Sequence, residues 1–158
     1  MPKGLDREVQ VIVTALSADQ EHYLDMLSII AASAALTISD IPFNGPVGAM
    51  RVGYVDGNFL FNPVASQMED SILDLRMAGT ADEINMVEAG ANEVSEELIV
   101  EALTRGHQAM QDVIRIQQQM QAEIGKPKFE VAVNPTDPAI LEAVRARVEE
   151  PLSNVLGK

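Results

Sequence analysis

The stretch "VGAMRVGYVDGNFLFNP", residues 47–63, carries the strongest local signal for the fold. Two short apolar runs flank Asp56-Gly57, and this dipeptide readily adopts the positive φ angles of a two-residue hairpin turn. Residues 47–63 are therefore predicted to form two antiparallel strands. The preceding "SDIPFNGP", residues 39–46, lacks the full glycine pattern, the lysine and the following helix of a phosphate-binding loop, so it is interpreted as a turn.

A second hairpin is predicted directly downstream. "SILDLRMAGT", residues 71–80, and "EINMVEAGAN", residues 83–92, are each alternating or apolar enough for a strand, with the turn at residues 79–82. Upstream, the β-branched run in "VQVIVTALSAD", residues 9–19, predicts one further strand. That strand leads into a helix start, where Ser17 and Gln20 have the spacing of a capping box.

Two amphipathic segments predict helices that cover these strands. Apolar residues recur at helical spacing over residues 20–38, and the small side chains there permit close packing on a sheet. Residues 95–124 form a longer segment with one apolar face, acidic residues in its first turn, and Gly125 at its end. Gly106 falls on or beside that face, where a missing side chain lets another element approach closely.

The C-terminal region predicts a linker and one more helix. Residues 125–138 contain three prolines, and Asp137-Pro138 has the signature of a helix that runs to about residue 149. The element order is β-α-β-β-β-β-α followed by a short helical extension. This order indicates the α+β class, with a mainly antiparallel or mixed sheet packed with helices. We expect residues 1–125 and 126–158 to form separate parts.

Composition narrows the function classes. The chain has 158 residues and no cysteine, which excludes disulfides and thiolate chemistry, and His22 and His107 are too far apart in sequence to announce a zinc site. A net charge of −13 repels the phosphate backbone of a nucleic acid, which argues against nucleic-acid binding through this chain's own electrostatic field. The longest mostly apolar run, residues 26–38, is too short to span a bilayer, so we expect a soluble protein without a membrane partner. The lack of cysteine makes a cytoplasmic location the default expectation.

The stretches quoted above, followed by "MVEAGANEVSEELIVEALTRGHQAM", residues 86–110, resemble the first RNase PH-like core of bacterial polynucleotide phosphorylases, also called polyribonucleotide nucleotidyltransferases. The resemblance covers nearly the whole chain. It implies that residues 1–125 are the C-terminal half of that core and that residues 126–158 open the family's all-helical domain. The family's longer chain also has an N-terminal half-core, a second RNase PH-like core, and KH and OB-fold domains. We therefore expect the sequence to be a piece of such a protein.

The resemblance also implies an activity for the parent protein. Members of the family degrade RNA from the 3′ end by phosphorolysis, release nucleoside diphosphates, and catalyse the reverse polymerisation. They use inorganic phosphate and magnesium, and they assemble as ring-shaped trimers. RNA would be bound through other parts of the parent chain, and the second core would pack against this one.

The family's active core provides a pattern for candidate site residues. Its phosphate-binding serine pair aligns with Leu24 and Asp25, which offer no hydroxyl and place a carboxylate where an anion would bind. Its two aspartates and lysine align with Met68, Asp74 and Arg76, so one of the two acids that hold magnesium is missing. The resemblance therefore implies no catalytic, cofactor-binding or metal-binding residue in this chain, with Asp74 and Arg76 as vestigial candidates.

Several alternatives remain open at this point. Glu69 and Asp70 flank Met68 and would replace the missing acid after a register shift, although a solvated loop is the simpler interpretation. His107 is interpreted as a packed helix residue, and Arg51 as a contact either to RNA or to a carboxylate.

Two other functions remain open for the whole chain. It is alternatively a free-standing scaffold or oligomerisation domain, or a small enzyme whose site, with Asp74 and Arg76, is completed by a second chain. Without the N-terminal half-core, apolar surface that the parent protein covers would be exposed. We therefore expect the chain to self-associate into a dimer or higher oligomer.

Overall fold

The computed structural model describes residues 1–2, 4–5, 7–131 and 136–156. By its internal contacts the chain divides into two compact units, residues 8–129 and the residues that remain at its two ends. Among the described residues, no helix combines the length and the apolar character needed to cross a membrane.

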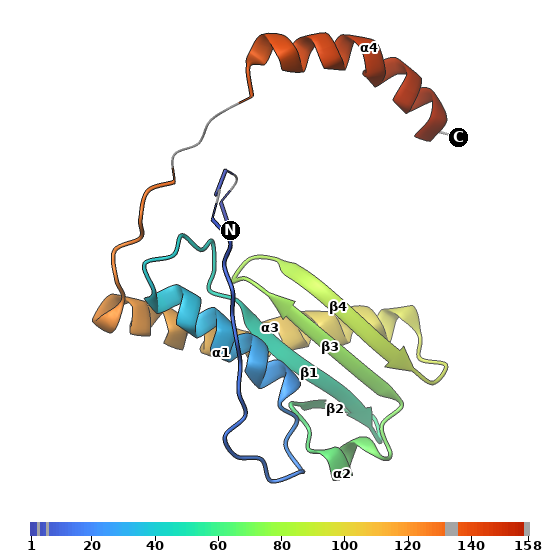
Figure 1. The fold of residues 1–158 in the computed structure, drawn as a ribbon. Helices are drawn as coiled ribbons and strands as arrows, with labels where there is room; N and C mark the ends of the chain where they lie inside the picture. Colours follow the sequence, from blue (N-terminus) through green and yellow to red (C-terminus); the bar gives the residue numbers. More distant parts are fainter. Residues whose placement is uncertain (3, 6, 132–135, 157–158) are drawn as a thin grey trace. The chain divides into compact units, whose positions relative to one another are not determined.

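Four antiparallel strands form the sheet of the larger unit (Figure 1). They are β1 (Gly48–Val55), β2 (Asn58–Phe61), β3 (Leu73–Gly79) and β4 (Ile84–Ala91), in the spatial order β2-β1-β3-β4. Both predicted hairpins are confirmed, because β1 pairs with β2 and β3 pairs with β4. Asp56 and Gly57 join the first pair with φ angles of 49° and 81°, the positive values that the turn requires.

Helix α3 (Glu96–Ile124) covers one face of this sheet (Figure 1). The helix begins where the Ser95 hydroxyl accepts a hydrogen bond from Leu98 N at 3.3 Å, and it ends at Gly125, as predicted. Since side chains alternate along a strand, every second residue of β1 and β3 points at α3. The antiparallel four-stranded sheet packed with helices confirms the predicted α+β class. The core between helix and sheet consists of Met50, Val52, Leu73, Leu75, Met77, Ala102, Met110 and Ile114.

Helix α1 (Asp25–Ile38) packs against β1 and α3. Its Met26 joins Ala49 and Ala78 in a second, smaller core cluster. Ala49 and Ala78 directly oppose one another on β1 and β3, and they alternate with residues of the α3 core. The smaller cluster therefore lies on the opposite face of the sheet. A short helix, α2 (Ala65–Met68), follows β2 and was not predicted.

A ring of three hydrogen bonds joins α1, α3 and the entry to β1. Ser33 Oγ donates to Gln117 Oε1 at 2.7 Å and accepts from Val47 N at 2.8 Å, while Gln117 Nε2 donates to Val47 O at 3.0 Å. The side chains of Ser33 and Gln117 are buried. Each buried polar atom in the ring has a partner, which removes the cost of burying it.

The strand predicted over the β-branched run of residues 9–19 is wrong. A strand needs a hydrogen-bonded neighbour, and the edges of the sheet are formed by β2 and β4. The run has no strand or helix, and its apolar side chains face solvent, with Ile12 77% and Leu16 94% exposed. The local pattern was right for a strand, but the larger unit offers the run no partner.

The predicted helix over residues 20–38 starts five residues later than expected, at Asp25. Asp19 Oδ1 accepts hydrogen bonds from the backbone N–H groups of Glu21 and His22 at 3.0 and 2.9 Å, and Gln20 has a φ angle of 67°. An aspartate side chain that binds nearby backbone groups offers them an alternative to helix. This turn replaces the predicted capping box and delays the helix.

Helix α4 (Pro138–Leu156) is longer than the predicted helix, which ended near residue 149. Its start is confirmed, because Asp137 Oδ1 accepts a hydrogen bond from Ala139 N at 2.9 Å. The helix continues through Pro151, which removes one backbone donor. Because α4 has no buried residue, water can satisfy the carbonyl that loses its donor. Residues 132–135 of the predicted linker lie outside the described residues.

Gly106 tests how closely α3 approaches the sheet. A Cβ added there would lie 2.5 Å from Met77 Sδ and 3.0 Å from Val52 Cγ2. Alanine in a helix gains about 1 kcal/mol over glycine, whereas overpacking a core costs about 1–3 kcal/mol. We expect Gly106→Ala to lower the free energy of unfolding by about 1 kcal/mol in urea denaturation, because the overpacking cost exceeds the gain in helix propensity.

The exposed Gln119 on the same helix provides the control. Gln119→Ala should leave the free energy of unfolding within about 0.5 kcal/mol of the unsubstituted chain. If Gly106→Ala has the same free energy of unfolding as this control, α3 does not lie as close to the sheet as the structure shows.

Candidate functional site

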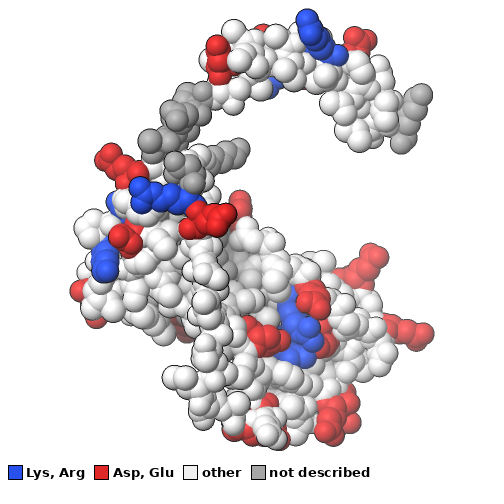
Figure 2. Space-filling view, viewed as in Figure 1, with Lys and Arg blue, Asp and Glu red and all other residues white. Residues whose placement is uncertain are grey.

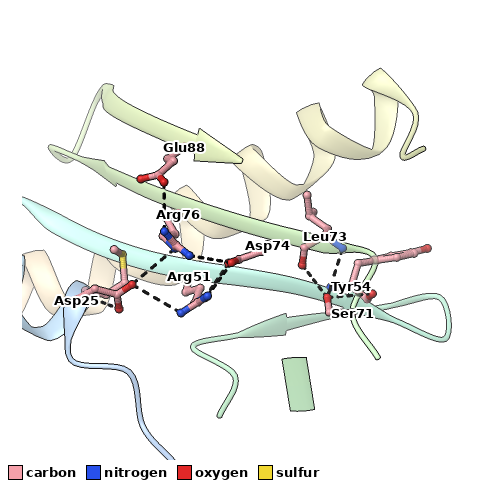
Figure 3. Close-up of polar contacts among 9 residues, drawn as sticks. Asp25, Arg51, Tyr54, Ser71, Leu73, Asp74, Arg76 and Glu88 are labelled. Atoms are coloured by element: carbon pink, nitrogen blue, oxygen red, sulfur yellow. Dashed lines mark hydrogen bonds and ion pairs between the residues drawn. The ribbon is translucent and has the colours of Figure 1, made fainter. Parts of the chain in front are cut away.

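The register of the sheet gathers charged side chains on the face opposite α3. Arg51 on β1 lies directly beside Arg76 on β3, and Arg76 lies beside Glu88 on β4. Asp74 is two residues along β3 from Arg76 and so faces the same side. Figure 3 shows these side chains together with Asp25, which comes from the first turn of α1. We call these five residues the charge cluster.

Arg51 and Asp74 form the strongest contact in the charge cluster. Arg51 Nε donates to Asp74 Oδ1 at 2.7 Å, and Arg51 Nη2 donates to Asp74 Oδ2 at 2.6 Å (Figure 3). This is the two-pronged guanidinium–carboxylate geometry that makes charged hydrogen bonds strong. Arg76 Nη2 also donates to Asp74 Oδ2 at 2.9 Å, and Arg76 Nη1 donates to Glu88 at 3.2 Å. Asp74 therefore binds both arginines at once.

Asp25 faces the same two arginines from α1. Its Oδ2 atom lies 3.7 Å from both Arg51 Nη1 and Arg76 Nε, and its Oδ1 atom accepts a hydrogen bond from Met26 N at 2.8 Å. The N-cap of α1, Leu24, contributes no side-chain hydrogen bond. A carboxylate in the first turn is favourable because the helix dipole places partial positive charge there.

The surroundings of Arg51 fix its charge and that of its partner. Burial alone would raise the pKa of Asp74, but the hydrogen bonds and charge of Arg51 hold it below its ordinary value of 3.8. Burial likewise works to lower the pKa of Arg51, and Asp74 outweighs it, so that pKa is raised. The guanidinium carbon of Arg51 also lies 3.6 Å from the centre of the Tyr23 ring, and its side chain is only 7% exposed.

The chemistry of the charge cluster does not fit a bound phosphate. Two guanidinium groups are matched by three carboxylates, so the cluster has no surplus of positive charge (Figure 3). Asp25 places negative charge at the helix end where an anion would otherwise find free N–H groups. Figure 2 shows the same balance on this face of the sheet, where acidic side chains border the basic ones.

The carboxylates of the charge cluster do not fit a magnesium site either. Magnesium takes oxygen ligands in near-octahedral geometry, and the carboxylates that bind it must be free to do so. Both oxygens of Asp74 already accept hydrogen bonds from guanidinium groups. Within residues 1–2, 4–5, 7–131 and 136–156, no group of three or more acidic or histidine side chains is arranged to hold a metal ion.

The structure brings together the site residues that the sequence singled out at the start of α1 and on β3. Met68 lies on the same side of the sheet, because a Cβ added to Gly53, the neighbour of Asp74, would come within 2.9 Å of its sulfur. Glu69 and Asp70 are exposed and are not part of the charge cluster. Of the two interpretations of Arg51, its contact with a carboxylate is the one that the structure shows.

The two histidines lie apart from the charge-cluster contacts. His107 Nε2 is 3.0 Å from Thr80 O and 3.4 Å from Gln111 Nε2, so it connects α3 to the β3–β4 turn. His22 Nδ1 is 2.6 Å from Asp19 Oδ2 in an exposed pair. His22 also lines a hollow of about 190 Å³ beside the start of α1. Asp25 and Arg51 line the same hollow, together with apolar residues such as Met26, Leu27 and Ile30.

Comparisons with known proteins agree with this architecture. Residues 45–109 match the family described as "3′ exoribonuclease family, domain 2". The chain is 47% identical over 155 residues to the polyribonucleotide nucleotidyltransferase of Heliobacterium modesticaldum, which covers 98% of this chain and 22% of that protein. It is 55% identical over 129 residues to the enzyme of that name from Thermomicrobium roseum, covering 82% of this chain and 16% of the relative.

A third relative gives the same result. The polyribonucleotide nucleotidyltransferase of Streptococcus pyogenes is 50% identical over 135 residues, which is 85% of this chain and 19% of the relative. The chain thus spans about a fifth of the length of these curated relatives. The resemblance to polynucleotide phosphorylases is confirmed. Residues 45–109 are thus similar to the second domain of the 3′ exoribonuclease family, and the chain as a whole is similar to a part of the polyribonucleotide nucleotidyltransferases.

Proposed function

We propose that this chain is a structural, non-catalytic half-core of a phosphate-dependent 3′-to-5′ exoribonuclease. The parent protein would degrade RNA by phosphorolysis, release nucleoside diphosphates and catalyse the reverse polymerisation. The names of the relatives and their identity to this chain support the parent activity. Asp74 supports the structural role, because both of its oxygens are occupied by arginines of the same sheet.

The other components of the reaction would come from outside these residues. We propose that magnesium, inorganic phosphate and RNA bind elsewhere in the parent protein, in a cytoplasmic trimer. A second RNase PH-like core would pack against the body formed by the sheet and its helices. The charge cluster would then stabilise this half-core, and the corresponding residues of the second core would carry the chemistry.

The absence of phosphorolysis by this chain is the first expected result. Purified chain incubated with poly(A), inorganic phosphate and magnesium should release no ADP above a buffer control. A complete polyribonucleotide nucleotidyltransferase assayed in parallel shows that the conditions support the reaction. Turnover by this chain that is lost in Asp74→Asn would show that Asp74 serves catalysis, and the structural role would be wrong.

Stability is the property that Asp74 should control. Asp74→Asn replaces an acceptor of three charged hydrogen bonds by a neutral amide whose N–H₂ group opposes the guanidinium donors. Hydrogen bonds to charged groups contribute about 1.5–3 kcal/mol, so we expect the free energy of unfolding to fall by about 2 kcal/mol in urea denaturation.

Asp112→Asn is the matched control, because it removes an aspartate–arginine pair on the exposed surface of α3, with side chains 74% and 62% exposed. Exposed pairs contribute about 0.2–1 kcal/mol, so the control should change stability little. Equal losses in the two variants would contradict a stabilising role for the charge cluster.

The stabilisation by Asp74 should depend on pH in one direction. Its pKa is lower in the folded protein than the ordinary value of 3.8, so the folded state keeps the carboxylate charged at pH values where the unfolded chain becomes protonated. The contribution is complete above that value and is lost as the pH falls toward the folded pKa. The melting temperature of the unsubstituted chain should therefore exceed that of Asp74→Asn by a constant gap near neutral pH.

This gap should narrow once the pH falls below about 3.8. Comparing the two proteins at each pH removes the effects of acid that are common to both. A gap that widens as the solution is acidified would show that the pKa of Asp74 is not depressed by its partners.

A further inference from the structure

The C-terminal end of α1 lacks a positive charge of its own. Its last turn contains no basic residue, although the exposed carbonyl groups of a helix end carry partial negative charge. The missing charge comes from Lys128, which follows α3 in the chain. Lys128 Nζ donates to Leu36 O at 2.8 Å, to Thr37 O at 2.8 Å and to Ser39 O at 2.6 Å.

The backbone on both sides of Lys128 is fastened to the same place. Lys126 N donates to Ile38 O at 2.9 Å, and Phe129 N donates to Asp40 O at 2.9 Å. Three side-chain bonds and two backbone bonds therefore attach Lys126, Lys128 and Phe129 to the end of α1 and the turn after it. The three hydrogens of the ammonium are all used, which satisfies the donor completely.

Lys128 is half-buried, so this contact is not a pair of fully exposed surface groups. Burial lowers the pKa of its ammonium, with the charge of Asp40 acting in the opposite direction. The larger compact unit of the chain also ends at Phe129, the last residue that is anchored in this way. The anchored segment thus coincides with the point where the chain leaves this unit.

We propose that residues 126–129 form a latch, in which the Lys128 ammonium closes the C-terminal end of α1 and fixes the point where the chain leaves the larger unit. Release of the ammonium would expose three carbonyl groups of α1 and the turn after it and free the two backbone bonds at Lys126 and Phe129. The five hydrogen bonds of the latch all end on residues 36–40, which are the end of α1 and the two residues after it, so their release breaks no hydrogen bond between strands. This inference does not depend on the proposed enzymatic role.

Amide hydrogen exchange on the full chain, resolved by NMR, tests the latch. Lys128→Met keeps an unbranched apolar side chain and removes the charge. We expect the amide of Phe129 to exchange at least about tenfold faster in this variant, with the amide of Lys126 also accelerated, because local opening costs less free energy than global unfolding. The paired amides of β1 and β3 in the same sample report whether the core is unchanged.

Lys126→Met is the matched control, since the Lys126 side chain is exposed and its contact to α1 is made by the backbone. It should leave the exchange of the Phe129 amide unchanged. The proposal is wrong if Lys128→Met leaves that amide unchanged, or if it accelerates the amides of the sheet by the same factor. It is also wrong if the Phe129 amide of the unsubstituted chain exchanges as fast as an unprotected amide, a result that needs no variant to fold.

Discussion

The two hydrogen bonds between Arg51 and Asp74 hold together the charge cluster on the face of the sheet opposite α3. They cross from β1 to β3, the two central strands, and they hold a guanidinium group that is almost completely buried. A buried charge is tolerated only when it is paired and its donors are satisfied. Because the α3 core occupies the other face, the two halves of each strand's alternation have different tasks. In β1 and β3 one half faces α3 and builds the larger apolar core, and the other half carries the charge cluster beside the smaller apolar cluster of Ala49 and Ala78.

This division explains why the candidate site residues at the start of α1 and on β3 form a coherent structure. Asp25, Asp74 and Arg76 occupy the places that the family resemblance assigns to phosphate and metal chemistry, and they lie together in the folded chain. Here each charge is bound by another charge of the same protein. A site of this kind gains rigidity from groups that a catalytic site must keep free for its substrate. The carboxylates and guanidinium groups of the charge cluster are therefore arranged to stabilise the sheet.

The sequence predicted those parts of the fold that depend on neighbouring residues. Asp56-Gly57 fixes the first hairpin by local backbone geometry, and the apolar stripe of α3 was sufficient to define that helix. Residues 9–16 were predicted wrongly because a strand depends on a partner, which is a property of the whole molecule. For the same reason the sequence singled out Asp74 and Arg76 but missed the contribution of Glu88. Only the register between β3 and β4 places Glu88 beside Arg76, although its position in the second predicted hairpin was a usable signal.

The ring of hydrogen bonds among Ser33, Gln117 and Val47 has a consequence for how this sequence can change over evolutionary time. Two of its members are side chains separated by 84 positions, and the third is the backbone of Val47, whose N–H and C=O groups remain with any residue there except proline. Loss of either side chain leaves buried polar atoms without partners, a defect that a second change at the other position can repair more easily than a change elsewhere. Residues 33 and 117 are thus expected to vary together among related sequences, so that substitutions at these two distant positions are inherited as a pair.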